Sequence, residues 1–178
     1  MINDAEDLTK KVFNSDASDL LASGKFGIEK ESLRVAQSTI SRQIHHESMG
    51  SPLCHKYITT DFSEAQLELI TPPLMDKKTG LIFLENIHHF VSYKIEDEIL
   101  WPLSMPPFIP SDEDIPVASY GSSNFALFKT AYRNGLSHRY GRSMQAISGI
   151  HFNYSLPEQI WESSLFNQEK KVSKKLRA

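Results

Sequence analysis

The spacing of apolar positions along the chain predicts alternating helices and strands. Apolar residues recur every three or four positions in a helix that packs on a core, and every second position in a strand. The elements expected on this basis are one or two short helices over 5–22, closed by Gly24, strands over 26–35 and 143–156, and helices over 76–98 and 122–141. Between 36 and 55 neither period is present, so we expect a loop with a short hairpin at most.

The segment over 56–73, KYITTDFSEAQLELITPP, places three carboxylates among residues that are usually buried. They belong to Asp61, Glu64 and Glu68. As one extended strand the segment puts Glu64 and Glu68 on a single face, and as a helix it does the same, because the two residues are four apart. Either structure gives an acidic face backed by core. Carboxylates in such a place are usually paired or bound to a metal.

Two other predicted strands also carry a polar face. Glu29 and Glu31 project to the same side, about 6.5 Å apart at a rise of about 3.3 Å per residue, and could serve one or two hard cations. An exposed strand edge with alternating charges is the alternative. His151 projects from the polar side of the strand over 143–156, as a metal ligand or as a structural histidine.

Other candidate ligands are weaker. His45 and His46 lack a third ligand at a metal spacing, and we expect them in a solvated loop. The single cysteine, Cys54, excludes an internal disulfide and a multi-cysteine zinc site, and we expect it to be a small, half-buried apolar residue.

The three polar faces, placed in one antiparallel sheet, would bring several oxygen ligands and one imidazole to a shared surface. Mutual repulsion would raise the pKa values of the carboxylates unless cations neutralised them. Oxygen-rich ligation favours magnesium or manganese over zinc. Neither glycine-rich phosphate-binding motif, GxxxxGK[ST] or GxGxxG, occurs in the sequence. A nucleotide would therefore be held through metal ions and basic side chains.

Composition narrows the class of protein. A chain of 178 residues, 40% hydrophobic and 23% charged, is typical of one globular domain. Without a long apolar run or an N-terminal signal, we expect a cytoplasmic protein that does not contact a membrane. Five of the 19 basic residues lie in 170–178, which leaves residues 1–169 with 14 basic and 22 acidic side chains, a net charge of −8. An acidic body argues against nucleic acid as a partner.

Successive blocks of the sequence resemble the N-terminal part of the proteobacterial type of glutamate–cysteine ligase. They are GIEKESLRV, HKYITTDFSEAQLELITP, WPLSMP, YGSSN, FKTAYRNGL, RYG and SGIHFNYSLP, in the order of the family, from about residue 24 to about 161. The resemblance implies ATP-dependent ligation of the γ-carboxylate of L-glutamate to L-cysteine through γ-glutamyl phosphate, the first step of glutathione biosynthesis. It implies an α+β fold like that of glutamine synthetase, an antiparallel funnel-like sheet with flanking helices.

The resemblance also implies roles for individual residues. The magnesium ligands, with manganese as an alternative ion, would be Glu29, Glu31, Asp61, Glu68 and His151. Substrate L-cysteine would be bound in a pocket lined by Phe62, Tyr132, Leu136 and Gln145. Arg133 would bind an anionic substrate or a phosphate. No residue is expected to bond covalently to substrate, and Glu64 is expected to lie at the surface or around the ligands.

Family members are much longer than this chain, so the resemblance implies an incomplete funnel. We expect a ligase-like domain over 1–161, followed by a polar, basic tail over 162–178. A complementing C-terminal chain would favour an enzyme. Two alternatives stay open: a related carboxylate–amine ligase with another acceptor amine, and a non-catalytic remnant that binds divalent cations or a partner.

Overall fold

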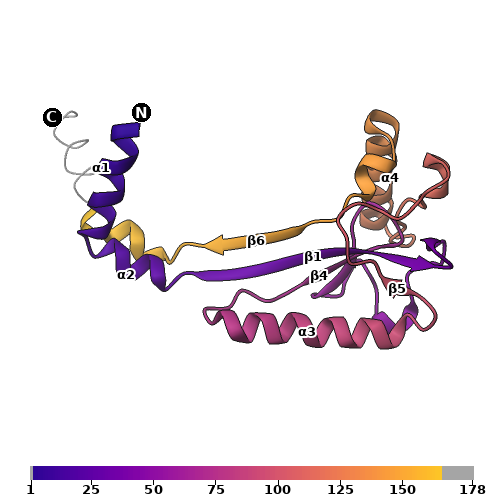
Figure 1. Ribbon diagram of the computed structural model, residues 1–178, viewed down its shortest axis with the longest axis horizontal. Coiled ribbons are helices and arrows are strands. Elements are labelled where there is room, and N and C mark those ends of the chain that lie inside the picture. The colour runs from indigo at the N-terminus through magenta and orange to yellow at the C-terminus, as the bar shows by residue number, and fades with distance from the viewer. Residues whose placement is uncertain (1, 166–178) are drawn as a thin grey trace. The chain divides into compact units, whose positions relative to one another are not determined.

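The computed structural model describes residues 2–165 and is shown in Figure 1. The described chain divides into two compact units. The larger unit contains residues 27–72 and 76–153, and the smaller one contains 2–26, 73–75 and 154–165. The tail expected over 162–178 lies outside the described residues from 166 onward.

The smaller unit is built from short helices, α1 (Ile2–Phe13), α2 (Ala17–Ala22) and a 3-10 helix over Glu158–Glu162. The prediction of one or two short helices at the start of the chain is confirmed. Asp16, which precedes α2, accepts hydrogen bonds from the hydroxyl and the amide of Ser164 at 2.7 and 3.1 Å. Gly24 follows α2 for another reason than the one expected: the ring of Tyr154 occupies the space that a Cβ would need.

Strand β1 (Lys25–Ala36) is the centre of the sheet of the larger unit. It pairs antiparallel with β4 (Gln66–Ile70), and toward its end with β2 (Thr39–Ile40) and β5 (Ile99–Leu100). Strand β3 (Ile58–Thr60) extends the sheet beyond β4, and β6 (Ile150–Ser155) pairs with β1. The predicted strand over 26–35 and the antiparallel sheet are thereby confirmed. Figure 1 shows β1 between β4 and β6.

The prediction of one continuous element over 56–70 is wrong, because the chain reverses there. Strands β3 and β4 form a hairpin around a tight turn over 61–65. Within it the amide of Asp61 donates to the carbonyl of Gln66, and the amide of Gln66 donates to the carbonyl of Ser63. The Ser63 hydroxyl accepts the amide of Ala65 at 3.2 Å. A serine that bonds its own backbone two residues later is a common turn device, which the alternating pattern concealed.

The prediction of a strand over 143–156 is half right. Residues Ser143–Ala146 form a 3-10 helix, and β6 begins only at Ile150. The Asp112 carboxylate stabilises the start of this 3-10 helix, because it accepts hydrogen bonds from the amides of Arg142 and Ser143 at 2.5 and 2.8 Å. Met144, expected on an apolar strand face, is therefore 65% exposed.

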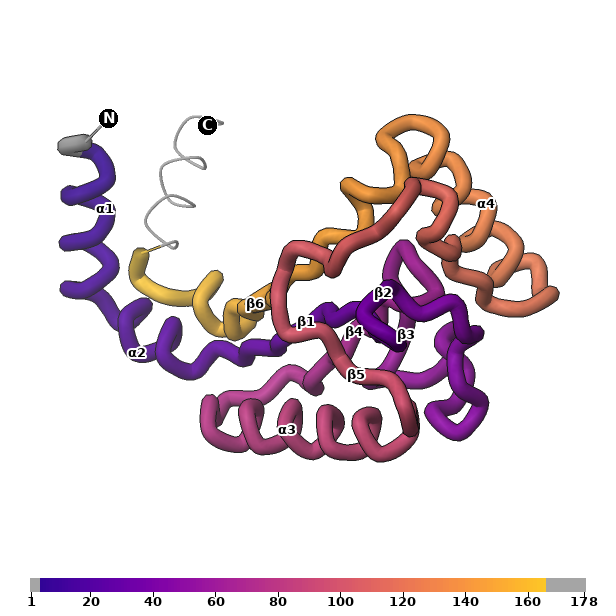
Figure 2. Tube along the Cα trace, turned by 45° about the vertical axis from the view of Figure 1, so that its right-hand side comes forward, coloured from indigo at the N-terminus to yellow at the C-terminus, as the bar shows by residue number. Residues whose placement is uncertain are grey.

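Two long helices lie on opposite sides of the sheet, as Figure 2 shows. They are α3 (Lys77–Lys94) and α4 (Asn124–Tyr140). Both begin where predicted, since Asp76 accepts the amide of Thr79 and Ser123 accepts that of Ala126. α3 ends four residues earlier than expected, where Glu96 adopts a left-handed φ of 50° and turns the chain toward β5.

Each side of the sheet has its own apolar core. The core toward α3 contains Met49, Ile58, Leu67, Leu69, Ile87, Val91 and Ile95. The core on the other side contains Leu33, Val35, Ile40, Phe62, Ala65, Ile115 and Ala146, with Leu136 of α4 packed against it. Alternate residues of β1 therefore face different neighbours. No helix of residues 2–165 is long and apolar enough to cross a membrane.

Candidate functional site

The acidic residues of β1 and β4 meet on the face of the sheet opposite α3. Glu31 lies directly opposite Glu68 in the antiparallel register, and Glu29 lies opposite Ile70. Directly opposed residues have Cβ atoms about 4.5–5.5 Å apart, and like charges in that position destabilise a sheet. The fold thus places two carboxylates where they need a compensating cation. The shared acidic face predicted for Glu29 and Glu31 is present in the structure.

His151 of β6 reaches the same face beside Glu29. Its Nδ1 lies 3.4 Å from Oε2 of Glu29, and the His151 side chain is 57% exposed. The neighbouring Glu31 accepts the amide of Gly149 at 2.9 Å through Oε2, while its own amide donates to the carbonyl of Gly149. The pairing of β6 with β1 is therefore what brings the imidazole to the acids.

Asp61 approaches from the turn between β3 and β4. Its carbonyl accepts the hydroxyl of Tyr120 at 2.8 Å and Nε of Arg133 at 2.6 Å. The carboxylate lies 3.8 Å from Nη2 of Arg133 and is 42% exposed. The amide of Asp61 also donates to the carbonyl of Gln66. Three hydrogen bonds therefore fix the backbone of this residue and leave its carboxylate accessible.

The pKa values show how strongly these acids interact. Burial and, after it, the negative charges of Asp61, Glu29 and Glu31 together raise the pKa of Glu68 to about 7, while His151 opposes the shift. Burial also raises the pKa of Glu31, against the lowering effect of its bond to Gly149. Shifts of this kind cluster at functional sites, although structural networks produce them too. A bound divalent cation would stabilise the charged form of both carboxylates.

The five predicted metal ligands do not form one coordination sphere. Among the described residues, no three histidine, cysteine, aspartate or glutamate side chains are close enough together to hold a metal ion. The structure brings them together in pairs, Glu29 with His151 and Glu31 with Glu68. The negative charge of Asp61 acts on Glu68 and raises its pKa. The donor set suits a hard cation chemically, because four of its five members are carboxylates.

Basic groups border the acidic face, and sequence reasoning missed one of them. On α4, Nζ of Lys129 and the guanidinium of Arg133 lie over the ring of Tyr120, at 4.1 and 4.9 Å from its centroid. Burial and the charge of Arg133 lower the pKa of Lys129, whereas Glu68 and Asp61 raise it. Lys129 and Arg133 are four residues apart, a spacing that puts them on one side of a helix and could have indicated that both border the site.

The residues predicted to line a cysteine pocket differ in exposure. Tyr132 is 58% exposed on α4, Gln145 is half-buried in the 3-10 helix, and Leu136 packs against the core. Phe62 is itself a core residue, 2% exposed. The first three could contact a small ligand directly. Phe62 supports the turn that carries Asp61.

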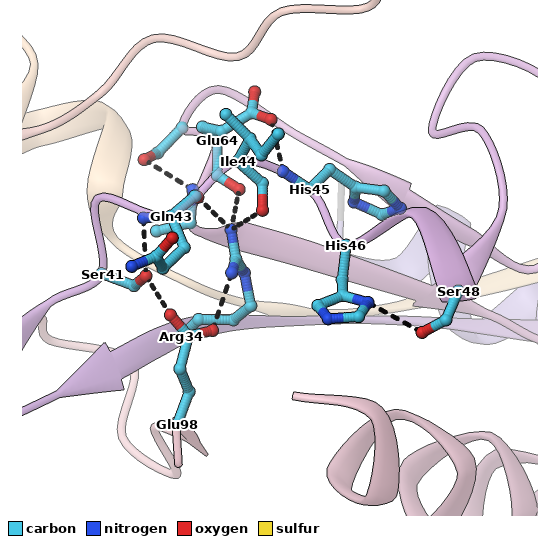
Figure 3. A network of polar contacts seen from close by, with 11 residues as sticks. Arg34, Ser41, Gln43, Ile44, His45, His46, Ser48, Glu64 and Glu98 are labelled. Atoms are coloured by element: carbon cyan, nitrogen blue, oxygen red, sulfur yellow. Dashed lines mark hydrogen bonds and ion pairs between the residues drawn. The ribbon is translucent and has the colours of Figure 1, made fainter. Parts of the chain in front are cut away.

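Behind the turn lies a buried polar network, drawn in Figure 3, that corrects two expectations. Glu64 is not at the surface: it is 7% exposed, and its carboxylate accepts the amides of His45 and Ser119, both at 2.7 Å. His45 is buried and not solvated, unlike His46. Arg34 donates to the Glu64 carbonyl at 3.0 Å. The network anchors the turn from behind.

The prediction that Cys54 is half-buried is also wrong. Cys54 is exposed and unpaired with another cysteine, not half-buried. It lies in the turns between the 3-10 helix over Glu47–Met49 and β3.

Comparison with known proteins links the chain to one family. The profile of the glutamate–cysteine ligase family matches residues 9–178. The glutamate–cysteine ligase of Alcanivorax borkumensis is 51% identical over 152 residues, which are 85% of this chain and 29% of that protein. The enzyme of the same name from Yersinia enterocolitica is 52% identical over 138 residues, 77% of this chain and 27% of that protein. The chain therefore spans less than a third of these relatives.

Two solved structures resemble this fold. One is the glutamate–cysteine ligase of Francisella tularensis in complex with AMP, with a TM-score of 0.70 and 37% identity over 79% of this chain and 28% of that one. The other is a bifunctional glutathione synthetase from Pasteurella multocida, with a TM-score of 0.73 and 39% identity over 83% of this chain and 19% of that one.

Proposed function

The chain belongs to the glutamate–cysteine ligase family, and we propose that it supplies the acidic, metal-binding face of an enzyme that joins L-glutamate to L-cysteine at the expense of ATP. The observation that carries the proposal is the opposition of Glu31 and Glu68 across β1 and β4, with Glu29, His151 and Asp61 beside them. In this reaction the γ-carboxylate of glutamate takes the terminal phosphate of ATP, and the amine of cysteine then displaces phosphate from the acyl phosphate.

The acidic side chains would act as ligands and not as nucleophiles. Glu29, Glu31, Asp61, Glu68 and His151 would hold magnesium, with manganese as an alternative. When bound, the ion would offset the negative charge of the phosphates during their transfer. Because these carboxylates repel one another in its absence, the same residues would be held in place by the cation.

The basic and aromatic groups on α4 would position the substrates. Arg133 lies at the border of the acidic face, and its side chain is only 13% exposed, so its charge is available to an anionic substrate at little loss of solvation. Lys129 lies beside it over Tyr120. Tyr132 and Gln145 would line the cysteine side, and Leu136 and Phe62 would back it from the core.

A titration tests the metal site directly. Calorimetry with magnesium, and then with a nonhydrolysable ATP analogue, would be run on the chain and on a Glu29→Gln, Glu68→Gln double variant. We expect saturable binding that the double variant loses. Glu85→Gln removes an exposed carboxylate of α3 and serves as the control, which should bind as the unaltered chain does. Equal binding by all three proteins would refute the assignment of these ligands.

The proposed reaction would need more protein than this chain contains, because the aligned residues are only 29% and 27% of the two relatives. We therefore propose a complementing C-terminal chain. The part of the Alcanivorax borkumensis relative that does not align with this chain would be produced separately. Mixing it with this chain should restore the formation of γ-glutamylcysteine. If the two chains form a complex that makes no product, the alternative is favoured, in which this chain is a remnant that binds divalent cations without catalysis.

We also propose a larger fold for this sheet, a division of the chain into domain and tail, and a location in the cell. The sheet would be part of a funnel like that of glutamine synthetase, residues 1–161 would form the ligase-like domain with a basic tail over 162–178, and the protein would act in the cytoplasm. A related ligase with another acceptor amine would share the acidic face. It would be distinguished in the reconstituted enzyme by replacing cysteine with other amines.

A further inference from the structure

We propose that the hollow between α3 and β5, on the face of the sheet opposite the acids, binds a small oxyanion such as inorganic phosphate through Lys30 and His88. The hollow has a volume of about 610 Å³. Its lining comes from the middle of β1, the last two turns of α3 and the segment around β5, and includes Lys30, His88, Ser92, Glu98 and Leu100. None of these residues belongs to the proposed metal site.

The alternation of β1 places Lys30 in this hollow. Glu29 and Glu31 face the other side of the sheet, whereas Lys30 lies opposite Leu69, whose side chain belongs to the core toward α3. Its Nζ donates to the hydroxyl of Ser32 at 2.5 Å, so the amine points along the sheet and remains half-buried. A lysine near a surface usually extends its amine into water. Here the amine is held against Ser32, and the side chain forms part of the wall of the hollow.

The charge of Lys30 is not balanced by an acid. Within residues 2–165, Lys30 forms no ion pair at 4.0 Å or less. Glu98 is the acidic residue of the lining, but Arg34 donates to its Oε2 at 2.7 Å and the Ser41 hydroxyl donates to its other oxygen. Both oxygens of Glu98 are therefore already in use. A half-buried cation without a counterion leaves room for an external anion.

The groups around the amine suit an oxyanion. Lys30 and His88 line the same hollow. Burial lowers the pKa of the His88 imidazole, and the positive charge of Lys30 lowers it further. A neutral imidazole still donates one N–H, and the hydroxyl of Ser92 can donate another hydrogen bond. One ammonium with two neutral donors is a common environment for phosphate, to which lysine contributes as a point charge.

Nuclear magnetic resonance of the full chain would test the site. Inorganic phosphate would be added at pH 7.5, with sodium chloride at matched ionic strength as the comparison, and amide shifts followed at Lys30, His88 and Ser92. We expect saturable shifts with phosphate alone. Lys30→Met, which keeps most of the aliphatic stem, should weaken binding at least tenfold. Lys78→Gln removes an exposed lysine from the same helix that carries His88, and should change nothing.

A second variant separates weaker phosphate binding from a general folding defect. His88→Gln keeps a donor but alters its position, and should weaken phosphate binding less than Lys30→Met does, with an unchanged spectrum elsewhere. Shifts equal in phosphate and chloride would overturn the proposal. So would saturable binding that survives in Lys30→Met, or shifts confined to Lys129 and Arg133, which would place the anion on the other face.

Discussion

Arg34 shows how one buried charge can fix several segments. Its side chain is 1% exposed and its guanidinium bonds to Glu98 at 2.7 Å and to the carbonyls of Gln43 and Glu64 at 2.6 and 3.0 Å. These partners come from the segment between α3 and β5, the loop after β2 and the turn before β4. The planar fork of arginine suits such divergent acceptors, which a lysine could not reach together.

Replacing Arg34 with methionine should therefore be costly. The change leaves the Glu98 carboxylate buried without its cation, and breaking a buried pair in this way costs about 3–5 kcal/mol. Urea unfolding would measure the change in the free energy of unfolding. Arg42→Met removes an arginine that also pairs with an acid but is exposed, and should cost at most about 1 kcal/mol. Equal losses would show that the Arg34 pair is not specially important.

His45 makes the stability of the chain depend on pH. Burial lowers the pKa of its imidazole and the charges of Arg34 and His55 lower it further, against Glu64, which raises it. Above the ordinary pKa of 6.5 the ring is neutral in the folded and the unfolded chain, and its contribution is fully present. As the pH falls below that value, the unfolded chain takes up the proton first, so stability is lost.

The variant His45→Gln isolates this effect, because glutamine does not titrate. We expect the free energy of unfolding to fall more between pH 7 and pH 5 in the unaltered chain than in the variant, when both are measured by urea unfolding. Other titrating groups contribute equally to both proteins and cancel in the difference. Identical slopes, or a steeper slope in the variant, would contradict the assignment.

At the same scale, some residues could be predicted and others could not. The shared face of Glu29 and Glu31 follows from the period of a strand, which is a local property. Glu64 is held in the interior by bonds to His45, Arg34 and Ser119, which lie 19, 30 and 55 residues away. Periodicity carries no information about such partners. Lys129 was missed for the same reason, because Tyr120 and the acids it faces lie outside its helix.

The long helices are the elements that the sequence predicts best, because their start signals are local. Asp76 accepts the amide of Thr79 at 2.7 Å at the beginning of α3. Asp76→Ala should lower the free energy of unfolding by about 1 kcal/mol, the usual value for losing such a cap. Asp97→Ala, at an exposed position after the helix, is the control and should change it by less than about 0.5 kcal/mol. Both would be compared by thermal and urea unfolding.

Elements whose limits depend on tertiary contacts were predicted less well. The segment over 56–70 has one alternating pattern across two strands, since the turn over 61–65 keeps Phe62 and Ala65 buried. The two-residue strand β5 follows a helix and precedes prolines, and pairing with Arg34 and Val35 alone defines it. A strand of this length has no period to detect.

At the scale of the whole molecule, β6 is the strand with the most exposed side chains among residues 2–165. All six of its residues are exposed, including Ile150 at 67%. We expect Ile150→Lys to change the stability of the isolated chain by no more than about 0.5 kcal/mol, as surface substitutions do. The same change should weaken association with the proposed complementing chain severalfold, measured by analytical ultracentrifugation. Unaltered association would place the contact elsewhere.

The exposure of β6 also has a consequence for the life of the protein in a cell. Extended segments that show apolar side chains and an unpaired edge are what chaperones and proteases select for. A chain without the proposed complementing chain would be open to both, and assembly would withdraw β6 from them. Limited proteolysis should then cut within residues 150–155 of the chain alone and spare that segment after mixing.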